Sequence, residues 1–221
     1  MNSSFDAVFD YVKGLSIIDT HEHLPLFESY RDRKTDVIKE YLIHYFPRDL
    51  ISAGLSMTDY QRAVSNDLSV AEKWNLLEPY WDICRYTGYG RALDIAARDL
   101  YGVDRIDRSS IENLNQFFIE ALNSGRHYSY VLHEKSNIKV SIVDSESTEC
   151  DSDFFRISYH VDGFIAPNTI DYIKHIEDES GVLISSFDDW LEACYKMLDK
   201  AFENGAVSLK SALAYERTLK Y

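Results

Sequence analysis

The sequence is poor in cysteine, and this scarcity excludes classes of protein that depend on disulfide bonds or on cysteine ligands. Its 221 residues include three cysteines, Cys84, Cys150 and Cys194, which are odd in number and far apart. This spacing excludes a disulfide framework and a cysteine-based zinc site, and it indicates reduced thiols in a cytoplasmic protein. Cys84 and Cys194 lie beside apolar residues in helical patterns, so we expect both side chains to be buried.

Basic residues are scarce as well. The sequence contains 23 lysines and arginines but 37 aspartates and glutamates, so its net charge is −14. No block of Lys or Arg offsets this charge, so we expect no nucleic-acid partner and no binding to a membrane. No apolar run approaches the roughly 18 residues of a membrane span, and the N-terminus lacks the features of a secretory signal. Phosphate-loop, dinucleotide-binding and Gly-x-Ser-x-Gly patterns are also missing.

The most informative pattern that is present is a His-x-His pair, His21 and His23, at the end of the apolar strand 15–24. Strand side chains alternate between faces, so both imidazoles, together with Asp19, should point the same way. Two imidazoles one pleat apart can reach a single divalent cation. The alternative is a surface pair without a ligand role, but the strand before the pair and the turn marker Pro25 after it favour a metal site. For Asp19 we weigh orientation of a histidine against a hydrogen bond to the backbone.

The hydrophobic periodicity predicts an α/β protein with a parallel sheet. No convincing strand occurs between about 28 and 135, so we expect a helical insertion or lid there, within one partial (β/α) barrel domain that spans 1–221. A closed barrel takes about 250 residues. Four core strands therefore correspond to the first half of a barrel, which would be truncated or would need a partner to close its edge. The expected strands are 15–24, 138–144, 155–161 and 206–215; the expected helices are about 5–13, 34–46, 58–66, 69–87, 89–101, 109–124, 168–179 and 187–203, with Thr58 and Ser109 among their caps.

Two further polar residues fall on expected strands. Lys210 lies in the apolar run 207–213, where alternation directs it toward the barrel interior. Because a buried lysine needs a partner or a modification, we weigh an ion pair with a nearby carboxylate against a catalytic role. His160 alternates with Ser158 and Asp162, and we weigh binding of a substrate carboxylate or other polar group against a structural role.

The remaining histidines lack ligand spacing, and we expect them to be ordinary surface or half-buried residues; they are His44, His127, His133 and His175. Arg85, Tyr86 and Arg91 could contact an acidic substrate, but a solvated helix face explains them equally well.

Three segments, 18–23, 155–162 and 205–217, resemble the amidohydrolase superfamily, in the amidohydrolase-related branch that includes decarboxylases and uronate isomerase. The resemblance implies a (β/α)8 TIM barrel, a metal-dependent hydrolase fold, with one or two divalent metals at the C-terminal strand ends. His21 and His23 match the metal ligands of its first strand. Lys210 matches the fourth-strand position, where members with two metals carry a carboxylated lysine. The histidines and the aspartate that the family carries on later strands have no counterpart here.

This resemblance implies a metal-dependent hydrolase that attacks a C–N or similar bond of a small-molecule substrate with metal-activated water. We expect the divalent metal to be zinc, with iron or manganese as alternatives. One alternative function is non-hydrolytic chemistry, as in a decarboxylase or a uronate isomerase, which the large insertion favours. Another is a catalytically incomplete half-barrel that acts only in assembly, as a homo-oligomer or with a missing C-terminal half.

Overall fold

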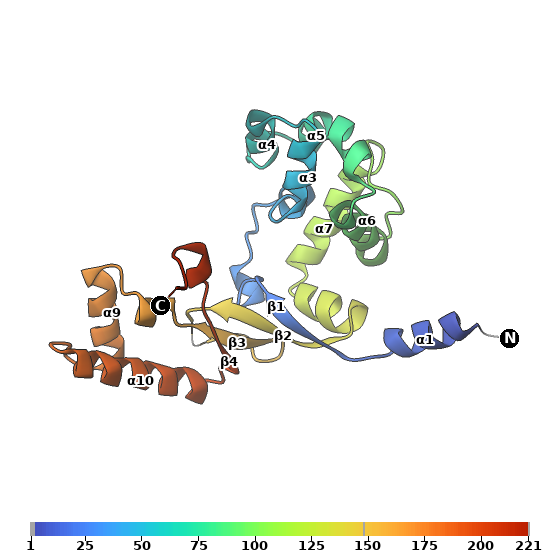
Figure 1. Cartoon of the computed structure of the whole chain (residues 1–221). Helices are drawn as coiled ribbons and strands as arrows, with labels where there is room; N and C mark the ends of the chain where they lie inside the picture. The colour runs from blue at the N-terminus through green and yellow to red at the C-terminus, as the bar shows by residue number, and fades with distance from the viewer. Residues whose placement is uncertain (1–2, 148, 221) are drawn as a thin grey trace. The chain divides into compact units, whose positions relative to one another are not determined.

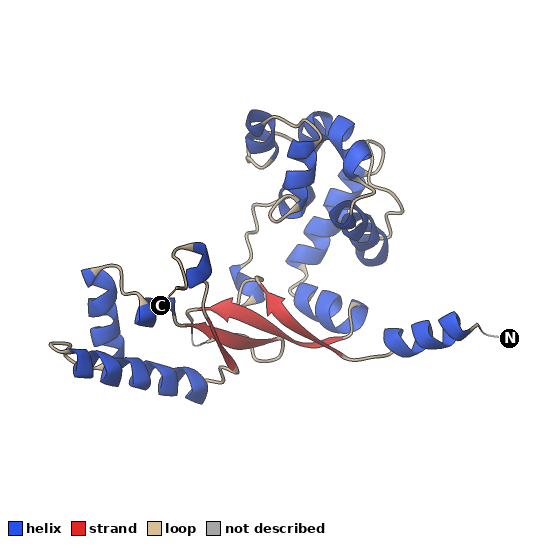
Figure 2. Ribbon diagram, viewed as in Figure 1, coloured by secondary structure: helices blue, strands red, loops and turns tan. Residues whose placement is uncertain are grey.

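The computed structural model describes residues 3–147 and 149–220, and they form two compact units (Figure 1). Unit 1 comprises residues 1–30 and 136–221, and unit 2 comprises residues 31–135. Unit 1 contains the β-sheet and three longer helices, whereas unit 2 is helical (Figure 2). In the described part of the chain, no helix has the length and apolar character needed to cross a membrane.

The sheet of unit 1 has four parallel strands in the order β1-β2-β3-β4. The β3–β4 register places His160 beside Lys210, so both end at the same edge of the sheet. Parallel strands joined by helical crossovers are the building pattern of a (β/α)8 barrel, and this chain forms a four-stranded half of one. The strands are β1 Ile17–Glu22, β2 Ile138–Ser145, β3 Phe155–His160 and β4 Ser208–Lys210.

The pairing between β1 and β2 contains an irregularity next to the histidine pair. Asp19 pairs with Ser141, but the next pair joins Glu22 to Val143, so β1 contributes one residue more than β2 over this step. A bulge of this kind re-aims side chains and interrupts strict alternation.

Helix α10 packs on β3 and on α9. Helix α10 begins after Ser186, whose hydroxyl accepts the Asp189 N–H at 3.2 Å, as the sequence predicted. Its apolar side contributes Trp190 and Met197 to a core with α9, while Ala201 packs with β3. The helices and short turns of unit 1 are α1 Ser4–Lys13, η1 Glu28–Tyr30, α8 Asp162–Ile165, α9 Ile170–Ser180, α10 Phe187–Glu203 and η3 Leu213–Tyr215.

Unit 2 has its own apolar core, in which Trp74, Leu77, Trp81 and Phe118 are almost completely buried. Buried cations are paired inside the unit: Lys73 lies 2.6 Å from Asp36, Arg31 lies 2.6 Å from Glu40, and Arg85 pairs with a carboxylate in the same way. The helical elements of unit 2 are α2 Val37–Tyr41, α3 Phe46–Ser52, α4 Met57–Ala63, α5 Val70–Cys84, α6 Gly88–Tyr101, α7 Ile111–Asn123 and the π-helix η2 Ser129–Lys135.

Some expected boundaries were wrong. The helix expected at 34–46 ends at Tyr41, and a separate helix, α3, has Pro47 in its first turn, where proline is tolerated. Ser56, not Thr58, caps α4; Ser110, not Ser109, stands at the cap position of α7 and makes no side-chain capping bond.

The strand expected at 206–215 was also wrong in its extent. It ends at Lys210, because the Ala212 N–H donates to the Asp162 carboxylate at 2.8 Å and the chain turns into η3. Leu213, which falls within the expected strand, lies buried beyond the end of β4.

Candidate functional site

The polar residues singled out on three of the strands lie where those strands end. His21 stands near the end of β1, His160 ends β3, and Lys210 ends β4. Asp144, close to the end of β2, joins them. In barrels of parallel strands, this edge carries the active site, because the loops that follow the strands meet there.

His21 and His23 face each other across the turn that ends β1. Their Nε2 atoms lie 2.9 Å apart, and the rings meet edge to face. The backbone beneath them is fixed by neighbouring carboxylates: the His21 N–H donates to Asp19 at 3.3 Å, and the N–H groups of His23 and Leu24 donate to Glu22 at 2.6 and 3.1 Å. Asp19 thus makes the backbone hydrogen bond that was one of its two expected roles.

This histidine pair fits part of the coordination sphere of a divalent metal. Two imidazole nitrogens directed at one point are a donor set that zinc, iron and manganese sites use. Within residues 3–147 and 149–220, no group of three or more His, Cys, Asp or Glu side chains could hold a metal ion. The chain therefore offers two ligands, and a complete site would need donors beyond these residues.

Asp144 lies between the two other strand-end residues. Its Oδ2 atom is 3.6 Å from the Lys210 ammonium, and its Oδ1 atom is 3.8 Å from Nε2 of His160. The Lys210 side chain is 36% exposed and not deeply buried, so the expected ion pair with a carboxylate is the role that the structure shows for it. Sequence reasoning missed Asp144, although its place at the end of the strand expected at 138–144 was the available signal.

Asp162 fixes the other side of His160. Its Oδ2 atom lies 3.7 Å from Nδ1 of His160 and accepts the Ala212 N–H, which ties the end of β3 to the segment after β4. Burial of this carboxylate raises its pKa, but the hydrogen bonds from Ser211 and Ala212, with His160 nearby, outweigh the burial, so the pKa lies below the usual 3.8. Asp162 is consequently held as a carboxylate.

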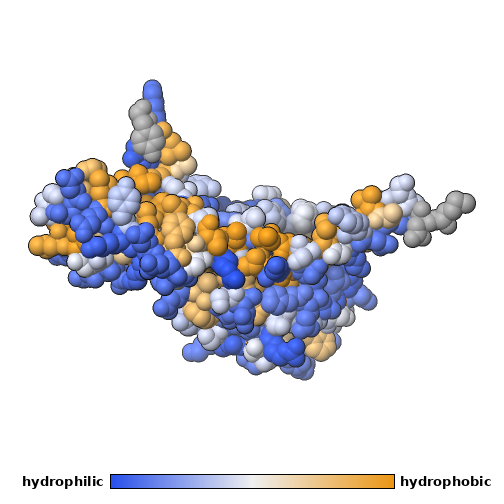
Figure 3. Space-filling view, turned by 90° about the horizontal axis from the view of Figure 1, so that it is seen from below, coloured by the Kyte–Doolittle hydropathy of each residue, from blue (hydrophilic) through white to orange (hydrophobic). Residues whose placement is uncertain are grey.

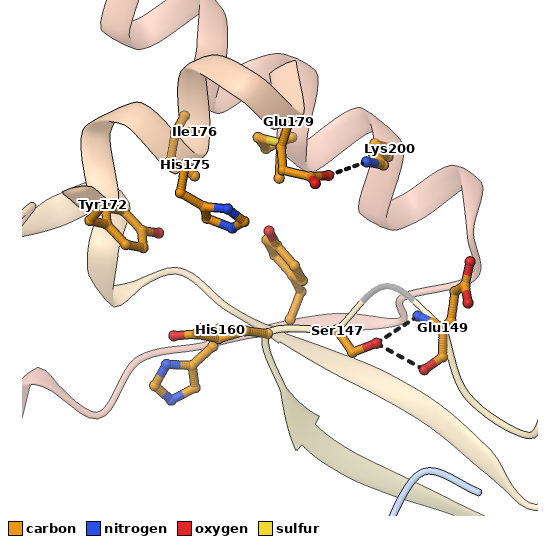
Figure 4. A pocket seen from close by; sticks show the side chains of 11 residues that line it. Ser147, Glu149, His160, Tyr172, His175, Ile176, Glu179 and Lys200 are labelled. Carbon is orange, nitrogen blue, oxygen red and sulfur yellow. Dashed lines mark hydrogen bonds and ion pairs between the residues drawn. The ribbon is translucent and has the colours of Figure 1, made fainter. Parts of the chain in front are cut away.

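Two cavities border His160. One, of about 240 Å³, opens beside Asp162, Asn168 and Thr169. The other, of about 260 Å³, lies between β3 and helices α9 and α10. Figure 4 shows the second cavity: Tyr172 and His175 lie on the helix side of β3, and the His160 ring points away from them. The nitrogens of the His160 ring lie instead near the carboxylates of Asp144 and Asp162.

The other candidate residues lie elsewhere. Arg85 is buried and pairs with Asp94 at 3.4 Å inside unit 2, so the expected solvated face is wrong for this residue. His127 is also buried in unit 2, against Arg31 and Tyr101, and not on the surface. Cys84 and Cys194 are buried, as expected.

Comparison with known proteins identifies relatives of one kind, although no family model matches the chain. It is 27% identical over 222 residues to the uronate isomerase of Bacillus licheniformis, covering 88% of this chain and 44% of the relative. It is 28% identical over 113 residues to the uronate isomerase of Corynebacterium efficiens, covering 50% of this chain and 24% of the relative. The chain thus spans less than half the length of the curated relatives that it matches.

Solved structures agree on the fold. The glucuronate isomerase of Caulobacter crescentus superimposes with a TM-score of 0.71 at 19% identity, covering 93% of this chain and 47% of that protein. A uronate isomerase of Bacillus halodurans gives 0.69 at 15% identity, covering 96% of this chain and 52% of that protein. The four parallel strands are therefore half of a (β/α)8 barrel, as expected. The chain is similar to the uronate isomerases, in line with the resemblance to the amidohydrolase-related branch, and it matches their N-terminal part.

Proposed function

We propose that this chain contributes the first-strand metal ligands and two further strand-end residues to a uronate isomerase-type active site. Such a site would interconvert the aldose and ketose forms of a sugar acid. The observation that carries the proposal is the match to a uronate isomerase over 88% of the chain, taken together with the His21–His23 pair at the end of β1. This match favours the isomerase alternative over our first expectation, hydrolysis of a C–N bond, because the relatives are named as isomerases.

His21 and His23 would hold the divalent metal through their Nε2 atoms. We propose zinc, with iron and manganese as alternatives; imidazole ligands favour zinc and iron, whereas manganese prefers oxygen ligands. When bound, the metal would polarise oxygen atoms of the sugar acid.

Lys210 and His160 have separate roles in the proposal. Lys210 is the catalytic candidate: its ammonium, beside Asp144, can stabilise negative charge that develops on a substrate oxygen. His160 is the substrate-binding candidate. Its ring lies between Asp144 and Asp162, which orient it, and either ring nitrogen can donate to a hydroxyl or carboxylate of the substrate.

We also propose that unit 2 is an insertion into a single partial barrel domain that spans residues 1–221. It lies in the sequence between β1 and β2, which pair with each other in the sheet. The chain leaves β1, folds the helical unit, and returns to the neighbouring strand.

Metal content tests the proposal directly. The purified chain is loaded in turn with zinc, iron(II) and manganese, freed of unbound metal, and measured by elemental analysis. We expect the parent chain to bind metal, and we expect its metal affinity to fall by at least about tenfold in His21→Ala and in His23→Ala. Substitution of residues that merely orient a metal ligand already lowers metal affinity by about this factor. His133→Ala is the matched control, because His133 is an exposed histidine of unit 2. Conversion of D-glucuronate to its ketose is then assayed with and without metal.

Two results would contradict the proposal. In the first, both histidine variants retain metal at the parental level, which removes the role of the pair. In the second, the metal-loaded protein hydrolyses amide substrates and leaves D-glucuronate unchanged. This result would favour a hydrolase function over an isomerase function.

A further inference from the structure

The cavity of about 260 Å³ between β3 and helices α9 and α10 has a polar lining, and apart from His160 its polar residues have no part in the proposed active site. All residues that line it belong to unit 1. Tyr159 and His160 are successive residues of β3, so their side chains point to opposite faces of the sheet. Tyr159 therefore faces the helices, whereas the His160 ring points away from them (Figure 4). The polar cavity also differs from the surface of α10 seen in Figure 3, where apolar atoms gather.

Tyr159 brings a hydroxyl group without a partner to this cavity. Only 4% of the residue is exposed, and its ring packs against Phe164 with 6.0 Å between the ring centroids. Within the described part of the chain, its hydroxyl makes no hydrogen bond. Burial raises the pKa of this phenol, and the nearby carboxylates of Glu146 and Glu179 raise it further. Buried polar groups normally have a hydrogen-bond partner, and a ligand in the cavity would supply one.

Tyr172 is a second phenol at the same cavity, and its position on α9 is fixed by close packing. A Cβ on Gly163 would clash with the ring of Tyr172, so this packing requires glycine at position 163. Burial raises the pKa of Tyr172 to about 12, and the carboxylate of Glu146 contributes to the rise. The hydroxyl is therefore neutral at pH 7, and its oxygen can accept a hydrogen bond from a ligand.

Carboxylates outnumber cations around the cavity. Glu146 and Glu149 lie after β2, and Glu179 lies on α9. The lining also contains Lys200, whose ammonium group is 2.6 Å from the Glu179 carboxylate. Three carboxylates and one ammonium group leave an excess of two negative charges among the described residues that line the cavity. An anion would be repelled, and within residues 3–147 and 149–220 no group of three or more His, Cys, Asp or Glu side chains could hold a metal ion. The lining therefore fits an organic cation.

We propose that this cavity binds a small aliphatic diamine in its doubly protonated form. One ammonium group would donate a hydrogen bond to the Tyr159 hydroxyl and lie beside Glu146. The other would lie beside Glu179 and share this carboxylate with Lys200. Hydrogen bonds and ion pairs of an ammonium group with such acceptors are stronger than neutral hydrogen bonds. The proposal is independent of the isomerase function, because no catalytic step enters it.

Titration calorimetry of the purified chain with putrescine, a four-carbon diamine, tests the site. We expect one putrescine to bind per chain. The affinity should fall by about tenfold in Tyr159→Phe, because a hydrogen bond to a charged group is lost, and by about fivefold in Glu146→Gln, because a carboxylate near the ammonium group is neutralised. Tyr195→Phe and Glu192→Gln are the matched controls, since they remove the same groups from exposed positions of α10 outside the cavity. Both controls should bind putrescine as the parent chain does.

Two further ligands show whether charge decides the binding. The neutral four-carbon diol and the anion succinate should not bind, although their length is similar to that of putrescine. Tyr159→Phe keeps the ring that packs against Phe164, and Glu146 is exposed, so both variants should fold; circular dichroism checks this. A chain that binds no putrescine would overturn the proposal. Equal binding of the diol or of succinate would overturn it as well, and so would unchanged affinity in Tyr159→Phe and Glu146→Gln or an equal loss in the controls.

Discussion

At the scale of single residues, Asp162 links the ends of two strands, and its ionisation should contribute to stability. Its pKa is lowered in the folded state, so its stabilising effect is present above about pH 4, the value for an unfolded chain, and is lost as the pH falls through the folded pKa. We expect Asp162→Asn to lower the urea midpoint at pH 7 and to lower it less at pH 3. Asp178→Asn, at an exposed position of α9, is the control. An equal loss for Asp162→Asn at both pH values would contradict this account.

The sequence was sufficient to select His21, His23, His160 and Lys210, because each is a polar residue on or next to a recognisable strand. Their partner Asp144 was not selected. Its role depends on the register that brings β2, β3 and β4 side by side, and a pattern within one strand carries no information about register. The bulge in β1 was missed for the same reason, since it exists only in relation to β2.

At the scale of elements, two glycines of α6 have opposite surroundings. A Cβ on Gly90 would lie 2.4 Å from the Cys84 carbonyl oxygen, whereas a Cβ on Gly88 meets nothing within 4 Å. Alanine favours a helix over glycine by up to about 1 kcal/mol. We therefore expect Gly88→Ala to be neutral or stabilising, and Gly90→Ala to cost about 1–3 kcal/mol because backbone must shift. Urea unfolding of both variants measures the change in the free energy of unfolding. Equal changes for the two variants would show that the close approach at Gly90 does not affect stability.

The boundaries of long helices with a clear hydrophobic periodicity were predicted correctly, whereas the boundaries of short elements were not. The helices expected at 89–101 and 187–203 match α6, which ends at Gly102 in the left-handed conformation, and α10, which begins after Ser186. By contrast, α2 has only five residues and α3 seven, too short for a periodic pattern to separate them. The length of β4 was overestimated because its end depends on a bond to Asp162, which is distant in the sequence.

At the scale of the whole molecule, the long stretch without strands indicated a helical segment, but its internal packing could not be read from the sequence. Unit 2 buries its cations against carboxylates of its own, as in the pair of Lys73 with Asp36. Such pairs join residues on different elements, and their formation requires the packed unit. The composition of the segment therefore predicts helices, and only the structure shows a compact core.

This separate core leads to a prediction about cooperativity. Leu77 is completely buried in unit 2, so Leu77→Ala should cost about 2–5 kcal/mol there. Because regions with separate cores can open independently, we expect faster hydrogen exchange for the slowest amides of α5 and α7, with the amides of α10 unchanged. Leu183→Ala, at a position that is 81% exposed in unit 1, should leave both sets within about 0.5 kcal/mol. If Leu77→Ala accelerated exchange equally in α10, the two units would unfold as one, and the stability of the strand-end site would depend on the helical unit.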